Sequence, residues 1–331
     1  MIKPVTLAVH INNACNFQCL HCYLGNIESP ARFGDQNQLL RLDIVEQMFE
    51  SIDKVNSVKR LPIIGMESFL NRASVDRLHM LAQRASDRDI QVSCITNGSN
   101  LKKYLDVELA NLLAFLDMSL EGGPNTYSQS RRSSFESFLH NIAFATHQGM
   151  KAINLLITVS SKNIMRIDDI MEGVRRIEQI APLQKVWFSP FIPTRNGRDA
   201  VTMVPTKNIA LALARNDFFL KRDPAQTHLV IDRYHREACR VHLGESPDDL
   251  WSDLDLDNHS ELRNRIWDYG DPVSLQRVLT MRHTGQLVHP LESLHGESVL
   301  EKHFIGTEPL ERALTRITKG NEKVIKHFYQ R

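Results

Sequence analysis

The chain contains 331 residues, of which 42% are hydrophobic and 24% are charged, a balance that is typical of a folded globular protein and excludes global disorder. The 40 Lys and Arg residues nearly match the 39 Asp and Glu residues, so the net charge of +1 provides no general field for nucleic acid or an anionic membrane. No apolar run is long enough to span a bilayer, and no secretory signal is visible. We therefore expect neither nucleic acid nor a membrane as a partner.

Short apolar strands alternate with helices over about the first 200 residues. The expected strands are 6–11, 61–64, 90–95, 115–120, 152–159 and 185–191, and the expected helices are 38–55, 75–85, 101–114, 134–148 and 164–180. This alternation predicts βαβ units and a parallel sheet of the α/β class. Six such units are fewer than the eight that close a full barrel.

The pattern changes after residue 198. A helix is expected over 207–220, a hairpin over 276–290, and two short helices over 308–317 and 321–329. We therefore expect a boundary near residue 200, between a first domain of residues 1–200 and a smaller α+β region of residues 201–331.

The five cysteines are unevenly spaced. Cys15, Cys19 and Cys22 form a C-x3-C-x2-C run directly after the first expected strand, whereas Cys94 and Cys239 stand alone. An odd number of cysteines without an export signal argues against a disulfide framework and predicts a cytoplasmic protein. Three thiolates on one short loop can bind three irons of a cubane cluster, and without a fourth cysteine nearby one iron stays open to another ligand.

The cysteine loop, with the aromatic Tyr23 after its last cysteine, resembles the signature of the radical S-adenosylmethionine (SAM) superfamily. The resemblance is to the peptide-modifying SPASM/twitch branch and covers about residues 4–200. Four further segments resemble family motifs in the family's order, namely residues 64–68, 96–98, 119–122 and 197–198. Each follows an expected strand, and ligand sites of parallel sheets lie at this edge.

The resemblance implies a partial (β/α)6 TIM-like barrel followed by a SPASM/twitch-like C-terminal region. It implies one [4Fe–4S] cluster and SAM as cofactors, with a flavodoxin- or ferredoxin-type protein as reductant. Reductive cleavage of SAM would then give a 5′-deoxyadenosyl radical that abstracts hydrogen from an unactivated C–H bond of the substrate.

The resemblance also implies which residues form the site. Cys15, Cys19 and Cys22 would be the metal ligands. The implied cofactor-binding residues are Tyr23, Gly65, Met66, Glu67, Asn97, Ser119, Arg131 and Arg132.

Their implied contacts with SAM differ. Glu67 would accept from the ammonium group of SAM. Ser119 would meet the ribose, and Tyr23 would lie near the adenine. Arg131 or Arg132 would pair with the carboxylate. Met66 stands where the family has a glycine, and Glu121 replaces the commoner Asp.

Other interpretations of the cysteines stay open. Cys15, Cys19 and Cys22 with His21 could hold structural zinc, although no second pair of zinc ligands follows. Cys94 lies in a strand pattern and is expected in the core.

Two further expectations concern the C-terminal region. Cys239 is flanked by Arg236 and Arg240, which favour its thiolate, and it is a candidate catalytic hydrogen-atom donor. The segment after Gly285 resembles a motif that carries a cysteine in SPASM relatives but has none here, so we expect no auxiliary cluster.

Three functions compete. The first is a radical SAM enzyme of natural-product biosynthesis that epimerises or crosslinks a ribosomally made peptide. The second is a radical SAM enzyme acting on a small molecule, such as a sugar, a nucleoside or an antibiotic intermediate. The third is a non-catalytic iron–sulfur carrier or sensor, which would need no SAM pocket.

Overall fold

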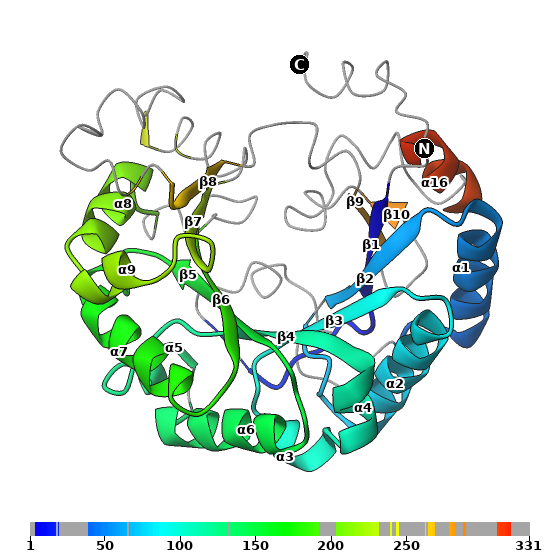
Figure 1. Ribbon diagram of the computed structural model, residues 1–331, viewed down its shortest axis with the longest axis horizontal. Helices are drawn as coiled ribbons and strands as arrows, with labels where there is room; N and C mark the ends of the chain where they lie inside the picture. The colour runs from blue at the N-terminus through cyan, green and yellow to red at the C-terminus, as the bar shows by residue number, and fades with distance from the viewer. Residues whose placement is uncertain are drawn as a thin grey trace.

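A ten-stranded sheet forms the centre of the molecule, and helices cover its outer side (Figure 1). The computed structural model describes residues 4–17, 19, 39–64, 66–131, 133–191, 203–231, 239, 243–244, 262, 264–268, 278–281, 287–288 and 310–318. Of the predicted site residues, Cys22, Tyr23, Gly65 and Arg132 lie outside these ranges.

The first six strands follow one another along the sheet, and each pairs parallel with the next. They are β1 (Val5–His10), β2 (Val58–Ile64), β3 (Gln91–Thr96), β4 (Leu113–Ser119), β5 (Ile153–Val159) and β6 (Leu183–Pro190). The predicted α/β class and the six parallel units are confirmed.

Helices connect these strands across the outer side of the sheet (Figure 1). They are α1 (Leu42–Val55), α2 (Arg72–Ser86), α3 (Leu101–Tyr104), α4 (Val107–Leu112), α5 (Tyr127–Arg131), α6 (Phe135–His147), the 3-10 turn η2 (Ile164–Arg166) and α7 (Ile167–Glu178). The single helix predicted over 101–114 is wrong, because the Asp106 side chain accepts from Leu109 N at 2.8 Å and starts a new helix, and β4 already begins at Leu113.

Elements from the second half of the chain extend both edges of the same sheet. They are α8 (Thr206–Ala214), α9 (Asp217–Lys221), β7 (Thr227–Ile231), β8 (Ile266–Asp268), β9 (Val278–Met281), β10 (Leu287–Val288) and α16 (Leu310–Thr318). Strands β7 and β8 continue the parallel sheet beyond β6, and β9 pairs parallel with β1. The predicted division at residue 200 therefore coincides with no break in the sheet, and it stays a prediction.

The sequence predicted a hairpin and a long helix in this half of the chain. The predicted hairpin is confirmed, since β10 pairs antiparallel with β9. The helix predicted over 207–220 is split, because the Asn216 side chain accepts from Phe219 N at 2.8 Å and begins α9. The helix expected over 321–329 lies outside the described residues.

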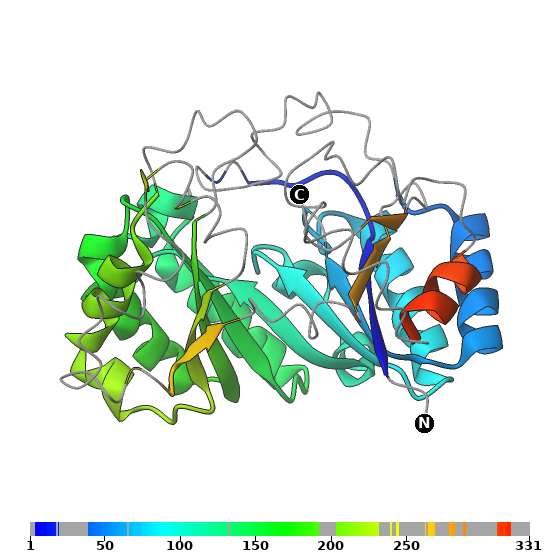
Figure 2. The ribbon, with the colours of Figure 1, turned by 90° about the horizontal axis from the view of Figure 1, so that it is seen from above.

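The strand order runs from β10 to β8, and the described strands do not close into a barrel. Figure 2 shows the sheet as a curved wall, with α16 beside α1 at one end. Lys54 Nζ donates to Glu311 Oε2 at 3.2 Å between these two helices. The expected partial barrel is therefore present, with additional strands at both edges.

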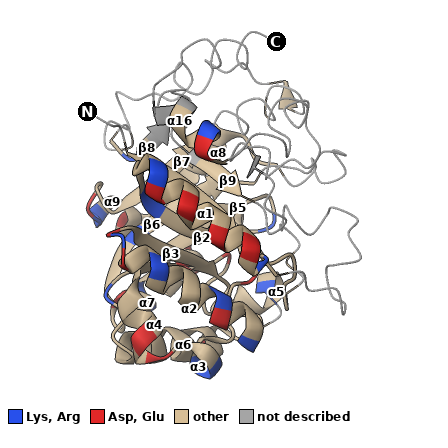
Figure 3. Cartoon of the chain, turned by 90° about the vertical axis from the view of Figure 1, so that its right-hand side faces the viewer, with Lys and Arg blue, Asp and Glu red and all other residues tan. Residues whose placement is uncertain are grey.

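The outer helices carry charges of both signs, which are interspersed along α1 and α2 (Figure 3). This mixture agrees with the near-neutral net charge. In the part of the chain that the structure describes, no helix has the length and apolar character needed to cross a bilayer.

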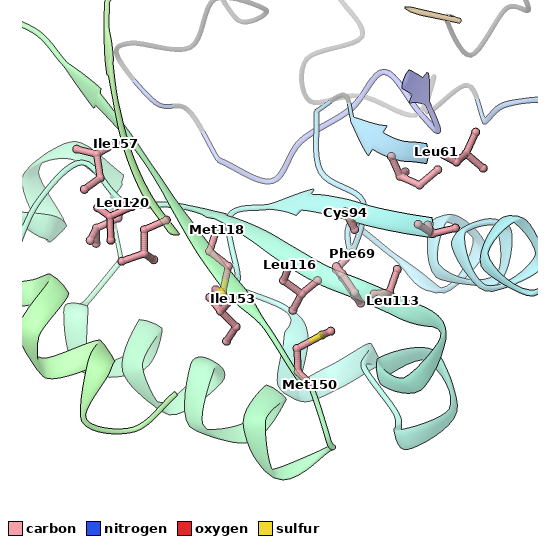
Figure 4. Packing of buried hydrophobic residues seen from close by; sticks show 14 of the residues in the cluster. Leu61, Phe69, Cys94, Leu113, Leu116, Met118, Leu120, Met150, Ile153 and Ile157 are labelled. Atoms are coloured by element: carbon pink, nitrogen blue, oxygen red, sulfur yellow. The ribbon is translucent and has the colours of Figure 1, made fainter. Parts of the chain in front are cut away.

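The two faces of the sheet have different roles. Met118 of β4 points outward toward α6, since a Cβ added at Gly98 would clash with its Cε and lie 3.3 Å from Phe138 Cε2. Figure 4 shows Leu116, Met118 and Ile153 in this outer core together with Met150. Side chains alternate along a strand, so Asp117 and Ser119 of β4 lie on the inner face. Cys94 is fully buried in β3, as predicted for a core residue.

Candidate functional site

The cysteine loop begins at the carboxyl end of β1 and is fixed there by buried polar contacts. Asn12 Nδ2 donates to the Glu67 carbonyl oxygen at 2.8 Å and to Ser74 Oγ at 3.0 Å. Glu67 N in turn donates to the Ala14 carbonyl oxygen at 3.2 Å. These bonds join the start of the loop to the segment after β2.

Cys15 and Cys19 are the two loop cysteines that the structure describes. Cys15 is partly exposed and Cys19 is buried. The Cys15 sulfur accepts from Phe17 N at 3.3 Å and from Asn97 Nδ2 at 3.8 Å. N–H groups directed at a sulfur favour the thiolate, which is the form that ligates iron.

Asn97 connects this loop to the turn after β3. Its Nδ2 also donates to Asn16 Oδ1 at 2.9 Å, while Asn16 Nδ2 donates to Ser99 Oγ at 2.8 Å. The Thr96-Asn97-Gly98 segment therefore positions the cysteine loop through the Asn97 side chain, in addition to linking β3 to α3. The predicted contact of Asn97 with the cofactor stays a prediction.

Glu67 is a buried carboxylate that ties together the segments after β2 and β3. It accepts from Phe69 N at 2.9 Å, from Thr96 Oγ1 at 2.6 Å and from Asn97 N at 2.8 Å. Burial raises the pKa of Glu67, and these hydrogen bonds act against that rise. The structure therefore assigns Glu67 a positioning role, while its contact with the SAM ammonium stays a prediction.

Arg131 and Glu121 form a buried ion pair beside the cysteine loop. Arg131 Nε donates to Glu121 Oε2, and only 6% and 3% of the two side chains are exposed. Burial alone would lower the pKa of Arg131, but the Glu121 carboxylate and the Cys19 sulfur raise it, so the guanidinium stays charged. A cation near Cys19 also favours the Cys19 thiolate.

The segment between β4 and α5 is held by Asp169 of α7. Asp169 accepts from Gly123 N at 3.1 Å and from Thr126 Oγ1 at 2.6 Å. A Cβ at Gly123 would clash with the Asp169 backbone, so this close approach requires glycine. Ser119 lies at the end of β4, just before this segment, and is half-buried.

Sequence reasoning missed the environment of Tyr127. Tyr127 is fully buried, with its ring 5.9 Å from that of Phe135 and 5.0 Å from that of Phe138. Burial raises its pKa, and Arg131, Glu121, Cys19 and Glu67 all act on it electrostatically. Its position three residues after Pro124 on a short helix gave no motif by which it could be found.

For two further predicted site residues the structure gives only the burial and the packing. Met66 is half-buried after β2. Cys239 is buried and packs with Phe191 and Met203, and its predicted role as a hydrogen-atom donor stays a prediction. The flanking Arg236 and Arg240 lie outside the described residues.

The donor set at this edge of the sheet fits an iron–sulfur cluster. Cys15 receives N–H groups, Cys19 lies near a buried guanidinium, and both follow β1. Within the described residues no three metal-ligating side chains meet, and Cys22 is not among those residues. The assignment of Cys15, Cys19 and Cys22 as the ligand set therefore remains a proposal.

Residues 9–178 match the sequence profile of the Radical SAM superfamily, which is more than half of the chain. This protein belongs to the radical SAM superfamily. It is an enzyme, and the cofactors of its superfamily are a [4Fe–4S] cluster and SAM. The superfamily membership predicted from the sequence is confirmed.

Curated relatives of this radical SAM protein match only part of it. An S-adenosylmethionine-dependent nucleotide dehydratase of Psychrobacter lutiphocae is 24% identical over 183 residues, covering 49% of this chain and 56% of the relative. A probable GTP 3′,8-cyclase of Methanococcus aeolicus is 24% identical over 186 residues, covering 56% of this chain and 60% of the relative. The matches thus span less than two thirds of these relatives.

Two solved structures share the fold of this chain. Streptococcus suis SuiB has a TM-score of 0.61 at 10% identity, covering 96% of this chain and 66% of its own. The anSMEcpe protein with bound AdoMet has a TM-score of 0.52 at 15% identity, covering 73% of this chain and 68% of its own. At such low identity these likenesses show the fold alone.

Proposed function

We propose that this radical SAM enzyme binds one [4Fe–4S] cluster through Cys15, Cys19 and Cys22 and acts on a small polar molecule of the nucleotide class. The observation that supports the cluster site is the convergence of Cys15, Asn97 and Glu67 at the carboxyl ends of β1, β2 and β3. Ligand sites of open parallel sheets lie at this edge. When bound, the cluster and SAM together supply a 5′-deoxyadenosyl radical for hydrogen abstraction.

The names of the sequence relatives support this substrate class. Two of them are named for reactions of nucleotides, a nucleotide dehydratase and a GTP cyclase. The peptide substrate expected from the SPASM resemblance has support only from solved structures at 10–15% identity, which carry no substrate information. We therefore favour the small molecule, and the peptide becomes an alternative outcome of the test.

The chain's own residues have three tasks in this proposal. Asn97 and the backbone N–H of Phe17 hydrogen-bond the Cys15 sulfur and hold it for iron. Glu67 fixes the segments after β2 and β3 relative to each other. Arg131 and Glu121 place a neutralised charge pair near Cys19 and keep water from that side of the site.

The test uses protein reconstituted with iron and sulfide without oxygen, reduced by dithionite or by flavodoxin. We expect SAM cleavage to 5′-deoxyadenosine, and we expect one of the four ribonucleoside triphosphates to be consumed and to raise that rate. Cys15→Ala should lose the brown colour and the cleavage. Cys94→Ala is the matched control and should keep both, because Cys94 lies in the core of β3.

Two results would contradict the proposal in different ways. Zinc in place of iron, or no 5′-deoxyadenosine from reduced protein, would exclude the radical mechanism. Cleavage of SAM without consumption of any nucleotide would exclude the substrate class. Transfer of deuterium from a labelled peptide into 5′-deoxyadenosine would instead support the peptide alternative.

A further inference from the structure

Three polar residues form a row across the inner face of the sheet. Asp117 of β4 is in register with Asn154 of β5, and Asn154 is in register with Lys185 of β6. Residues in register on neighbouring parallel strands point to the same face. Asn154 Nδ2 donates to Asp117 Oδ1 at 2.9 Å, and these two side chains are buried, with residue exposures of 2% and 6%.

The hydrogen bonding of this row is incomplete. The second polar atom of the amide, Asn154 Oδ1, is buried and has no hydrogen-bond partner among the residues that the structure describes. Trp187 lies two residues beyond Lys185 on β6 and therefore on the same face. Its indole Nε1 is also buried, with no hydrogen-bond partner in the described part of the chain. Native proteins rarely leave such atoms unpaired, because a buried polar atom without a partner loses its hydrogen bonds to water and gains none in return.

The unpaired atoms are complementary. Asn154 Oδ1 is an acceptor and Trp187 Nε1 is a donor, so one small group with a donor beside an acceptor can satisfy both. The amide-like edge of a nucleobase is such a group, whereas a phosphate or a simple carboxylate offers acceptors only. The pattern therefore favours an uncharged heterocyclic edge.

The charges around the row agree with an uncharged ligand. Burial raises the pKa of Asp117 to about 7, while Asn154 and Lys185 act against that rise. On the next strand, burial lowers the pKa of His228 to about 4, so this imidazole is neutral at pH 7. At pH 7 Asp117 is therefore only about half ionised, and it offsets part of the positive charge of Lys185.

The row also lies at a suitable place relative to the SAM edge. Ser119, for which the family resemblance implies a SAM contact, is two residues after Asp117 on the same face of β4. Two residues along a strand correspond to about 6.6 Å. A group bound at Asp117 and Asn154 would therefore lie one inward-facing position below the cofactor edge.

We propose that Asn154 and Trp187, with Asp117 orienting the Asn154 amide, form the subsite that binds the base of the substrate. The inference rests on the proposed function and adds the group that is recognised and the residues that recognise it. Asn154 and Trp187 touch the ligand directly, whereas Asp117 is a positioning residue.

The test uses calorimetry on the reconstituted protein. It measures binding of the four ribonucleoside triphosphates and of ribose 5-phosphate, which is a probe without a base. Trp187→Phe removes the N–H and keeps an aromatic ring. We expect it to weaken binding of the preferred nucleotide about tenfold, since a lost hydrogen bond of about 1.4 kcal/mol corresponds to that factor. The affinity of this variant for ribose 5-phosphate should differ from that of the wild type by less than twofold.

A second variant and a control complete the test. Asn154→Leu should weaken binding of the same nucleotide at least tenfold, with less than a twofold effect on binding of ribose 5-phosphate. Tyr104→Phe on α3 removes one polar hydrogen far from the inner face and should bind as the wild type does.

The outcomes separate the two proposals. If a nucleotide is bound and consumed, but both variants bind it as tightly as the wild type, the subsite is wrong and ordered water fills the row. If no nucleotide binds the wild-type protein, the substrate class is wrong and the subsite proposal is overturned with it.

Discussion

The Glu121 carboxylate and the Arg131 guanidinium are both removed from water in the folded protein, since only 3% and 6% of their side chains are exposed. Removal of two charges from water costs several kcal/mol per ion, and their mutual attraction offsets this cost only while both are present. Asn163 Nδ2 and Ser130 Oγ add contacts to the Glu121 carbonyl oxygen, at 3.2 and 3.4 Å. The pair therefore joins β4 to α5 next to Cys19.

Loss of one partner should be far more harmful than loss of both. Glu121→Gln leaves Arg131 buried without its carboxylate and should lower the free energy of unfolding by about 3–5 kcal/mol. The double variant with Arg131→Gln should lose less than the sum of the two single changes, with a coupling above about 1 kcal/mol. Urea unfolding of the three variants measures this coupling.

An exposed ion pair provides the control. Arg176 Nη2 and Glu136 Oε1 are 2.8 Å apart, with 33% and 61% of the side chains exposed. Glu136→Gln should cost less than about 1 kcal/mol, as surface pairs do. Equal losses for Glu121→Gln and Glu136→Gln would show that the buried pair carries no special energy.

Some contacts of single residues could not be predicted from the sequence. The resemblance to the radical SAM family pointed to Arg131 and to Glu121 separately. It could not pair them, because the ion pair depends on how α5 folds back beside β4. Tyr127 was missed for the same reason, since its burial arises from packing against α6.

Among the connecting elements, the turn after β3 combines a positive φ with close packing against β4 and α6. Gly98 has a φ of +77°, and a Cβ there would clash with Met118 Cε. Gly98 N also donates to Thr96 Oγ1 at 3.0 Å, which keeps Thr96 and Asn97 directed at Glu67 and Cys15. The shape of this turn therefore controls the position of the cysteine loop.

Gly98→Ala should reduce both stability and cluster content. Alanine in the left-handed region costs about 1–2 kcal/mol, and the displaced turn should loosen the contact between Asn97 and the Cys15 sulfur. We expect less iron per chain after reconstitution, measured by absorbance near the cluster band and by iron analysis. Thermal unfolding reports the loss of stability.

Gly149→Ala is the matched control for this turn. Gly149 also has a positive φ, +96°, but it lies between α6 and β5, at the opposite ends of the strands, and a Cβ there would meet only Asn111 Oδ1 at 3.9 Å. It should lose similar stability and keep its iron. Full iron content in Gly98→Ala would contradict the role of the turn.

At this scale the sequence pattern was informative where the elements are long and periodic. Strands such as β5 and helices such as α2 were predicted to within a few residues. The short helices α3 and α4 were merged, because a cap at Asp106 interrupts an apolar pattern that otherwise continues. Side-chain caps act over three residues and are easily hidden in such a pattern.

For the molecule as a whole, the central sheet is larger than the six strands that the sequence predicted. Strand β9 has only four residues and pairs with β1, about 270 positions earlier in the chain. Such a pairing leaves no local signature, because its partner is fixed only by the completed fold. The inner row of Asp117, Asn154 and Lys185 was missed likewise, since it arises from register between three strands.

Burial of Asp117 in this sheet predicts a specific pH dependence of global stability. Its pKa is about 7 in the folded protein and near 3.8 when unperturbed. Between these values the folded state holds a proton that the unfolded chain has released, so this residue's contribution to stability falls as pH rises toward 7 and is constant above it. Lys185, Cys94 and Asn154 are the neighbours that act on this carboxyl or respond to it.

Asp117→Asn removes this titration while retaining an acceptor for the Asn154 amide. Relative to the wild type, the variant should gain on the order of 2 kcal/mol in unfolding free energy between pH 5 and pH 8. Urea unfolding at both pH values measures the change. Asp43→Asn is the control, because Arg41 lowers the pKa of the exposed Asp43, and its stability difference from the wild type should be equal at the two pH values. A pH-independent difference for Asp117→Asn would show that the carboxyl is ionised throughout and that the inner row is charged.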